Sequence, residues 1–234
     1  MRSFQKIWKA APAKIKETKE ALQLEIGVFC GTFNPVHLGH LLIAECARDQ
    51  LKLDKVIFVT SPSPPHRADE LLDGRARHEL VKAAVADNPY FEASSIELER
   101  QGPSYTYDTI SALGSIYGEG SNINLIIGGD NLSQLKDWYE VEKLLKACRI
   151  LVVPRLRYIE NTDGSLVRIG EEPDKLKEEF PEVRIEIIDF PGIAISGSKI
   201  RERLSQNKSI LYMVPNPVND LILKNGYFKA KLKT

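Results

Sequence analysis

One turn-rich stretch near the N-terminus constrains this chain more than any other part of it. A mostly apolar run at residues 24–29 is followed by Gly-Thr-Phe-Asn-Pro-Val-His-Leu-Gly-His at 31–40. A short apolar run that ends at a glycine predicts a buried strand. Beyond the proline, apolar residues at 38, 41, 42 and 46 recur at the spacing of one helical face. The stretch therefore predicts a strand, a tight polar turn and a helix.

Two histidines stand at the start of that helix. His37 and His40 are three residues apart, so both can point the same way, and Gly39 between them lets a ligand approach the backbone closely. Free N–H groups and the helix dipole make such a terminus attractive to phosphate. From these residues alone, a phosphate site and an ordinary structural turn explain the stretch equally well. A metal site would need a third ligand at recognisable spacing, and none is evident.

The rest of the chain alternates between strand-like and helix-like segments. This alternation predicts an α/β fold, namely a doubly wound, Rossmann-like parallel sheet in a single domain with a helical C-terminal tail. The predicted parts are an N-terminal extension at 1–23, the domain at 24–228 and a tail at 229–234, with a charged surface insertion at 155–182. The predicted strands after the first are 55–60, 91–98, 123–127, 150–153 and 184–188, and helices are expected after Asp73, through 110–113, from 195–201 and at 218–223.

Composition excludes several classes of function. The 32 basic and 32 acidic residues cancel, so global charge points neither to nucleic acid nor to an anionic membrane. No apolar run approaches the roughly 20 residues of a membrane span. The three cysteines lack metal-ligand spacing and indicate a reducing compartment, and residues 1–23 lack the apolar core of a signal peptide. We therefore expect a cytoplasmic protein without nucleic-acid or membrane partners. The sequence does not decide its oligomeric state, and a homo-oligomer is one alternative.

Two further loops carry groups suited to a nucleotide. Ser196, Ser198 and Arg201 surround a predicted helix start, where hydroxyls, backbone N–H groups and a forked cation can bind phosphate. Gly129 and Asp130 follow the most apolar strand and suit a ribose or an adenine edge. Each loop could instead be an ordinary helix cap. Because the carboxyl ends of parallel strands share one edge of a sheet, these loops should converge with 31–40 on one crevice.

The residues at 31–40 resemble the signature of nucleotidylyltransferases that share a His-x-Gly-His motif. Ile-Ser-Gly-Ser-Lys-Ile-Arg at 195–201 resembles the serine motif of the same enzymes. Together with Gly-Pro-Ser-Tyr-Thr at 102–106, Ile-Gly-Gly-Asp-x-Leu at 127–132, Trp138 and Pro-His-Arg at 65–67, they resemble the nicotinate-nucleotide adenylyltransferases over most of 26–228. The chain departs from that pattern at Cys30 (usually glycine), Asn34 (often aspartate), Arg67 (commonly lysine), Leu156-Arg157 (usually Pro-Gly) and Gly197-Ser198.

The resemblance implies a reaction in NAD biosynthesis. ATP and nicotinate mononucleotide would be joined to nicotinate adenine dinucleotide with release of pyrophosphate, and Mg²⁺ would be bound through the substrate phosphates. It implies catalytic roles for His37, His40 and Arg201. For ATP binding it implies Gly31, Thr32, Phe33, Gly39, Gly129, Asp130, Ser196, Ser198 and Arg201, and for the mononucleotide Asn34, His66, Arg67, Thr106, Trp138 and Arg155.

The sequence leaves four competing functions open. The chain could act on nicotinamide mononucleotide, or it could be a pantetheine-phosphate adenylyltransferase. Pantetheine-phosphate adenylyltransferases, however, lack the run that this chain carries at 102–106 and the context of Trp138. A cytidylyltransferase would carry a longer, arginine-led serine motif, whereas Ala194 and Ile195 precede Ser196 here. The fourth, from a different class, is a catalytically silent nucleotide-binding regulator, and measured turnover separates it from an enzyme.

Overall fold

The computed structural model describes residues 23–62, 71–118, 120–154, 157–160, 166–169 and 174–228. Residues 1–22 of the predicted extension, the tail at 229–234, His66, Arg67 and Arg155 lie outside these residues, so the predicted domain boundaries stay predictions. Within them no helix combines the length and apolarity that crossing a bilayer requires.

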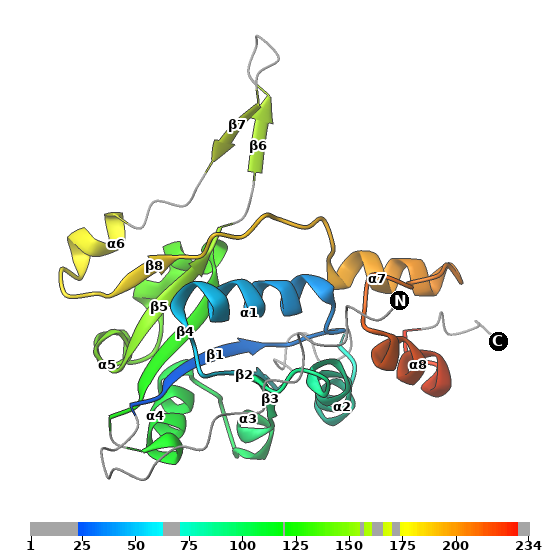
Figure 1. The fold of residues 1–234 in the computed structure, drawn as a ribbon, viewed down its shortest axis with the longest axis horizontal. Coiled ribbons are helices and arrows are strands. Elements are labelled where there is room, and N and C mark those ends of the chain that lie inside the picture. Colours follow the sequence, from blue (N-terminus) through cyan, green and yellow to red (C-terminus); the bar gives the residue numbers. More distant parts are fainter. Residues whose placement is uncertain are drawn as a thin grey trace, which may run out of the picture.

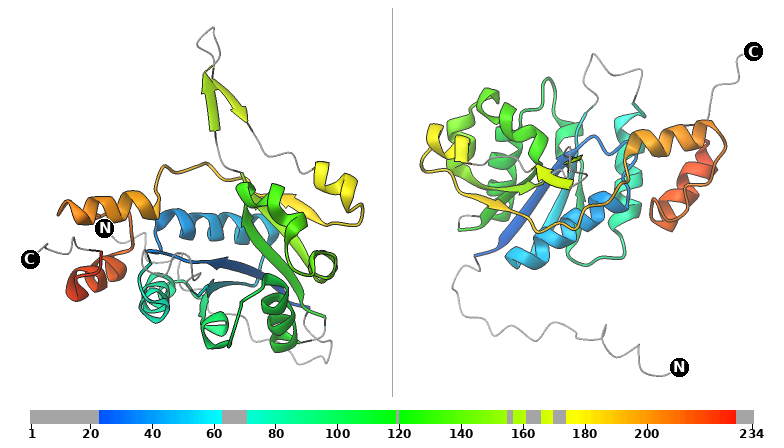
Figure 2. Two further views of the ribbon diagram at one scale, coloured as in Figure 1. Left: turned by 180° about the vertical axis from the view of Figure 1, so that it is seen from behind. Right: turned by 90° about the horizontal axis from the view of Figure 1, so that it is seen from above.

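Six strands form one parallel sheet in the order β3-β2-β1-β4-β5-β8, with helices on both faces (Figures 1 and 2). This confirms the predicted doubly wound α/β fold. The strands are β1 Glu25–Gly31, β2 Lys55–Thr60, β3 Phe91–Ser94, β4 Asn122–Gly128, β5 Cys148–Val153 and β8 Ile185–Ile187. The helices are α1 Leu38–Leu51, α2 Gly74–Val85, α3 Ile96–Glu99, α4 Thr106–Tyr117, the 3-10 helix η3 Gly129–Asp137, α5 Val141–Ala147, α6 Asp174–Glu179, α7 Gly197–Ser205 and α8 Asn216–Asn225.

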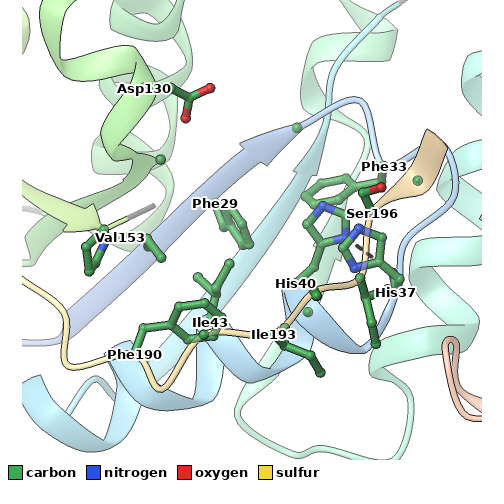
Figure 3. Close-up of a pocket in the computed structure, with 18 of the residues that line it drawn as sticks. Phe29, Phe33, His37, His40, Ile43, Asp130, Val153, Phe190, Ile193 and Ser196 are labelled. Carbon is green, nitrogen blue, oxygen red and sulfur yellow. Dashed lines mark hydrogen bonds between the residues drawn. The ribbon is translucent and has the colours of Figure 1, made fainter. Parts of the chain in front are cut away.

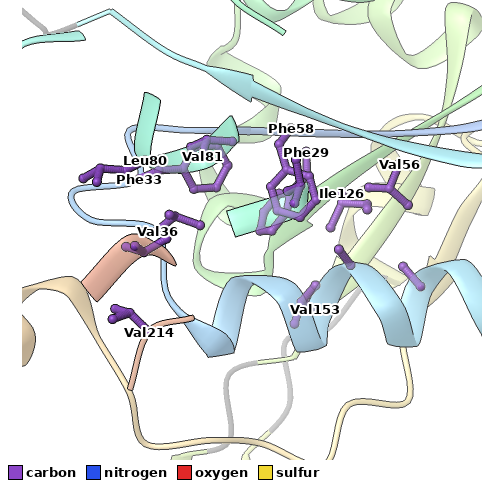
Figure 4. Packing of buried hydrophobic residues seen from close by; sticks show 14 of the residues in the cluster. Phe29, Phe33, Val36, Val56, Phe58, Leu80, Val81, Ile126, Val153 and Val214 are labelled. Carbon is purple, nitrogen blue, oxygen red and sulfur yellow. The ribbon is translucent and has the colours of Figure 1, made fainter. Parts of the chain in front are cut away.

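Alternating strand residues build a separate core on each face of the sheet. Phe29, Phe58 and Ile126 point to the face covered by α1, α2, α7 and α8, where they join the cluster drawn in Figure 4. Their chain neighbours, such as Val28 and Ile57, point to the face covered by α3, α4, η3, α5 and α6. Strands buried on both faces read as continuous apolar runs, which is why the sequence pattern identified them.

One predicted strand is only half correct. The pattern predicts an extended segment over 91–98, but β3 ends at Ser94 and the short helix α3 begins at Ile96. The oxygen Oγ of Ser95 donates to Oε1 of Glu99 at 2.5 Å, and Glu97 is buried. The prediction failed because alternating apolar and acidic residues at 96–99 fit a strand edge as well as one helical turn.

The predicted insertion at 155–182 divides into two parts. The antiparallel hairpin of β6 Arg157–Glu160 and β7 Leu166–Ile169 is separate from the six-stranded sheet and projects from it in Figure 1. Helix α6 instead returns to the sheet, because its Leu176 is buried in the second core. Only the hairpin part therefore fits the expected surface insertion.

The outer edge of β8 is occupied by the side chain of Gln50 at the end of α1. Its Nε2 donates to the carbonyl oxygen of Ile187 at 3.0 Å, and its Oε1 accepts from the N–H of Asp189 at 2.8 Å. The neighbouring Ile188 N–H donates in the opposite direction, to Val152 of β5. Gln50 thus ties α1 to the start of the segment 188–196, which runs beside α1 to α7 (Figure 1).

Candidate functional site

The carboxyl ends of β1, β4 and β5 open into one cavity of about 1030 Å³. Its polar end is formed by the turn after β1 and the start of α7, and its apolar walls include Phe29, Ile43, Val153, Phe190 and Ile193 (Figure 3). The loops at 31–40, 128–131 and 195–197 converge here, as the sheet topology predicts. Of the predicted loops, 61–67 is described only at residues 61 and 62.

The two histidines lie face to face at the N-terminus of α1. Their ring centroids are 3.7 Å apart with planes inclined by 20°. His37 occupies the N-cap position and not the first helical turn, and its backbone N–H donates to Nδ1 of His40 at 3.2 Å. A neutral imidazole that accepts at Nδ1 carries its proton on Nε2. His40 is therefore held in the tautomer whose single ring N–H donor is at Nε2.

The rings of Phe29 and Phe33 pack against the His40 ring of this pair. The ring of Phe33 meets His40 edge-on at 5.1 Å, and Phe29 meets both rings at 6.0 Å (His40) and 5.6 Å (Phe33). Phe33 adopts the left-handed conformation at φ 44° and its side chain is buried. A Cβ on Gly31 would lie 3.0 Å from the Phe33 ring, so a glycine at this position lets the turn fold back over the strand end.

Burial keeps both histidines neutral near pH 7. It lowers the pKa of His37 to about 4. It also lowers the pKa of His40 well below its usual value, with a smaller contribution from the neighbouring His37 charge. An anion placed against the rings would oppose this effect, because a nearby negative charge favours the imidazolium form. The pair is thus suited to meet a group that brings negative charge.

The start of α7 faces the histidines across the polar end of the cavity (Figure 3). Ser196 caps the helix, with Oγ accepting from the N–H of Lys199 at 3.3 Å, and its hydroxyl proton remains available as a donor. Arg201 turns towards the β1 turn, and its Nη1 donates to the carbonyl oxygen of Asn34 at 2.7 Å. Ser198 is exposed and, like Arg201, is not among the residues that line the cavity. Of the predicted serine motif at 195–201, Ile195, Ser196 and Gly197 line the cavity.

On the opposite side, β4 ends at Gly128, and Gly129 and Asp130 begin η3. A Cβ on Gly128 would lie 2.5 Å from Oδ1 of Asp130, so this glycine makes room for a carboxylate of the same loop. Asp130 lines the cavity, whereas Gly129 is buried and does not line it.

Three other predicted residues that the structure describes, Asn34, Thr106 and Trp138, do not line the cavity. Asn34 is buried, and its Oδ1 accepts from the N–H of Leu72 at 3.2 Å. Thr106 begins α4, as expected, and Trp138 follows η3 and is half-buried against the second core. The rings of Tyr105 and Tyr139 stack at 4.3 Å, which places these two stretches side by side.

The apolar walls of the cavity were missed by sequence reasoning. Val153 ends β5, and Phe190 and Ile193 lie in the irregular segment after β8. The available signal was their position just beyond the carboxyl ends of two predicted strands. A cavity with apolar walls and one end rich in donors suits a flat aromatic group that carries phosphate.

Comparison with known proteins agrees with this geometry. The sequence model of the family described as cytidylyltransferase-like matches residues 28–203. Relatives described as "probable nicotinate-nucleotide adenylyltransferase" include one from Caldicellulosiruptor bescii, 39% identical over 88% of this chain and 100% of the relative, and one from Dictyoglomus thermophilum, 40% identical over the same shares. Among solved structures, the Plasmodium falciparum nicotinic acid mononucleotide adenylyltransferase in complex with NaAD has a TM-score of 0.67 at 16% identity and covers 90% of this chain and 100% of that chain. At that identity the structure supports the shared fold alone.

Proposed function

Because the chain belongs to the nicotinate-nucleotide adenylyltransferase family, among the cytidylyltransferase-like proteins, we propose that it joins ATP to nicotinate mononucleotide. The products are nicotinate adenine dinucleotide and pyrophosphate. The observation that carries the proposal is the stacked His37–His40 pair, which faces the cap of α7 across one cavity. Two preorganised sets of phosphate donors that line one cavity suit a triphosphate.

The proposed reaction is a single in-line displacement. A 5′-phosphate oxygen of the mononucleotide attacks the α-phosphorus of ATP, the bond from that phosphorus to the β-bridging oxygen breaks, and pyrophosphate leaves with the electron pair. No covalent enzyme intermediate is needed. Catalysis therefore consists of positioning the substrates and stabilising charge on the α-phosphoryl oxygens.

Each polar group then has a role consistent with its geometry. Nε2–H of His40 donates to an α-phosphoryl oxygen, and His37 lies beside it. Ser196 and the free N–H groups at the start of α7 hold the departing pyrophosphate, with Arg201 one turn further on. Phe190, Ile193 and Val153 enclose the adenine base, and Asp130 lies where a ribose would follow.

Mg²⁺ fits this site as a companion of the triphosphate. Among the residues that the structure describes, Asp130 is the one carboxylate that lines the cavity, and no group of three metal-ligating side chains occurs. Mg²⁺ commonly takes its ligands from substrate phosphates and water. When bound, it would neutralise phosphate charge.

We place the second substrate beyond the cavity, beside the stacked stretches that carry Thr106 and Trp138. Backbone N–H groups and the hydroxyl at the start of α4 offer donors to the nicotinate carboxylate, and Trp138 offers a ring face. A carboxamide would bring N–H₂ against these donors. Each unpaired buried polar group costs about 1–3 kcal/mol, so we expect roughly a tenfold to hundredfold preference for the acid.

The test is product formation with each mononucleotide at saturating ATP. Nicotinate adenine dinucleotide and pyrophosphate should form in equal amounts, and catalytic efficiency should be higher with the nicotinate substrate. Equal efficiencies, or a preference for the amide, would favour the nicotinamide-type transferase. Turnover with CTP in place of ATP would favour a cytidylyltransferase, and turnover with phosphopantetheine in place of the mononucleotide would favour a pantetheine-phosphate adenylyltransferase.

The three free cysteines fit a reducing compartment, and we propose a cytoplasmic location.

A further inference from the structure

One arginine of α2, Arg77, is completely buried against the turn that follows β1. Arg77 has 0% of its surface exposed and stands on the helical face that otherwise carries Leu80, Val81 and Val85. Burying a guanidinium among apolar groups is costly unless its N–H groups are used in hydrogen bonds. An aliphatic residue would fill the same position at no such cost, so the bonds of Arg77 need an explanation.

Those bonds join two connections at the carboxyl edge of the sheet, the one after β1 and, near both of its ends, the one between β2 and α2. Nη1 donates to the carbonyl oxygen of Thr32 in the turn after β1 and to that of Ser61 after β2, the latter at 2.8 Å. Nε donates to the carbonyl oxygen of Leu72, ahead of α2, at 2.8 Å. Arg77 itself does not line the cavity, whereas Thr32 does.

A second set of bonds continues from this point to α7. The N–H of Leu72 donates to Oδ1 of Asn34 at 3.2 Å, and the carbonyl oxygen of Asn34 accepts from Nη1 of Arg201 at 2.7 Å. Asn34 is 6% exposed, so water competes little for these contacts. The path Arg77–Leu72–Asn34–Arg201 thus connects α2 to the turn that carries Thr32 and Asn34, and it ends at the helix that faces the histidines.

We propose that Arg77 is the positioning residue of the nucleotide site: it holds the Thr32–Asn34 turn in the place where His37, His40 and Arg201 can act on one triphosphate. This inference rests on the proposed function. The turn is held directly at Thr32 by Arg77, and at Asn34 by Leu72, whose carbonyl oxygen Arg77 also binds. A displacement of about 1 Å at reacting groups can cost a hundredfold in rate. Arg77 acts entirely through other residues.

The experiment compares Arg77→Lys and Arg77→Ala with matched changes at Arg75, which is exposed on the same helix. Lysine keeps the charge but cannot reach three carbonyls in fork geometry. At a temperature where circular dichroism shows each variant folded, we expect Arg77→Lys to bind ATP and pyrophosphate at least tenfold more weakly in calorimetry and to lower kcat at least tenfold. The Arg75 variants should retain wild-type values. Millimolar guanidinium should partly restore Arg77→Ala but not Arg77→Lys.

A purely structural role predicts another pattern. Activity would then fall only in proportion to the unfolded fraction, and folded Arg77→Lys would keep wild-type kcat, KM and ligand affinity, which would overturn the proposal. If Arg77→Ala does not fold, Arg77→Lys decides alone. Failure of the proposed function is recognised separately, from the absence of dinucleotide formation by the wild-type protein. The binding measurements still test Arg77 in that case, and a wild-type protein that binds neither ATP nor pyrophosphate would refute both ideas.

Discussion

Gly197 should not tolerate a side chain. An ideal Cβ at this first residue of α7 would lie 2.8 Å from the carbonyl oxygen of Asn34 and 3.4 Å from Nη1 of Arg201. Reaching an ordinary contact distance requires a displacement of about 0.6 Å, in a place where the Arg201–Asn34 bond is only 2.7 Å long. Overpacking of this kind costs about 1–3 kcal/mol. Replacing glycine also lowers the conformational entropy of the unfolded chain, which stabilises the folded protein by about 0.5–1 kcal/mol and offsets part of that cost.

Gly197→Ala should therefore destabilise the protein by about 0.5–2 kcal/mol, which is roughly 1–8 °C in Tm for a chain of this size. The displacement occurs at the pyrophosphate end of the site, so we also expect the apparent ATP affinity to fall about tenfold. Differential scanning calorimetry with and without pyrophosphate measures the first effect, and initial-rate kinetics over a range of ATP concentrations measures the second.

Gly114→Ala is the matched control. Gly114 lies within α4, where an added Cβ meets nothing within 4 Å. The same substitution should stabilise the protein there by about 0.5–1 kcal/mol. If Gly197→Ala instead matched Gly114→Ala in Tm and kept wild-type ATP kinetics, α7 would not approach the turn as closely as described, and the reasoning would fail.

Three further predictions concern the charged end of the site. His40→Ala should lower kcat about a hundredfold in a folded protein, since one preorganised donor at developing charge is worth about 3 kcal/mol; near-normal turnover in a folded variant would reject the role. Arg201→Ala should weaken ATP binding as well as turnover, because pyrophosphate is present in ground and transition states alike; an unchanged KM for ATP would count against it. Because burial lowers the pKa of His37 to about 4, the unfolded chain binds more protons than the native one between about pH 4 and 6.5, so stability is full above that range and falls as the pH is lowered through it. His37→Gln should accordingly lose less stability than the wild type between about pH 7.5 and 5 in urea unfolding, by on the order of 1–2 kcal/mol, and equal losses would contradict the assignment.

Local patterns predicted the fold well because the central strands β1, β2, β4 and β5 are buried on both faces. Asp73 illustrates the success: the sequence predicts it as the cap of α2, and its Oδ1 accepts from the N–H groups of Arg75 and Ala76. Arg77 illustrates the limit. The helical period placed it on the buried face, but the carbonyls that it binds belong to turns brought together only by the folded sheet. A charged residue at an apolar-face position was the signal for a buried polar network.

The site follows the same division. His37 and Ser196 are the N-cap residues of α1 and α7, so the local sequence pattern places them, and both line the cavity. The apolar walls could not be predicted, because Phe190 and Ile193 belong to an irregular segment whose path depends on long-range contacts. Thr106 and Trp138 are brought near one another by a Tyr105–Tyr139 stack that no local spacing indicates.

The contact between Gln50 and β8 also bears on self-association. The edge of a sheet exposes unpaired N–H and C=O groups that can template a strand from another molecule and start aggregation. Here the amide of Gln50 satisfies both the outward carbonyl of Ile187 and the outward N–H of Asp189. One side chain thereby occupies the place of a seventh strand, and β-strand addition at this edge would first have to break two hydrogen bonds to α1.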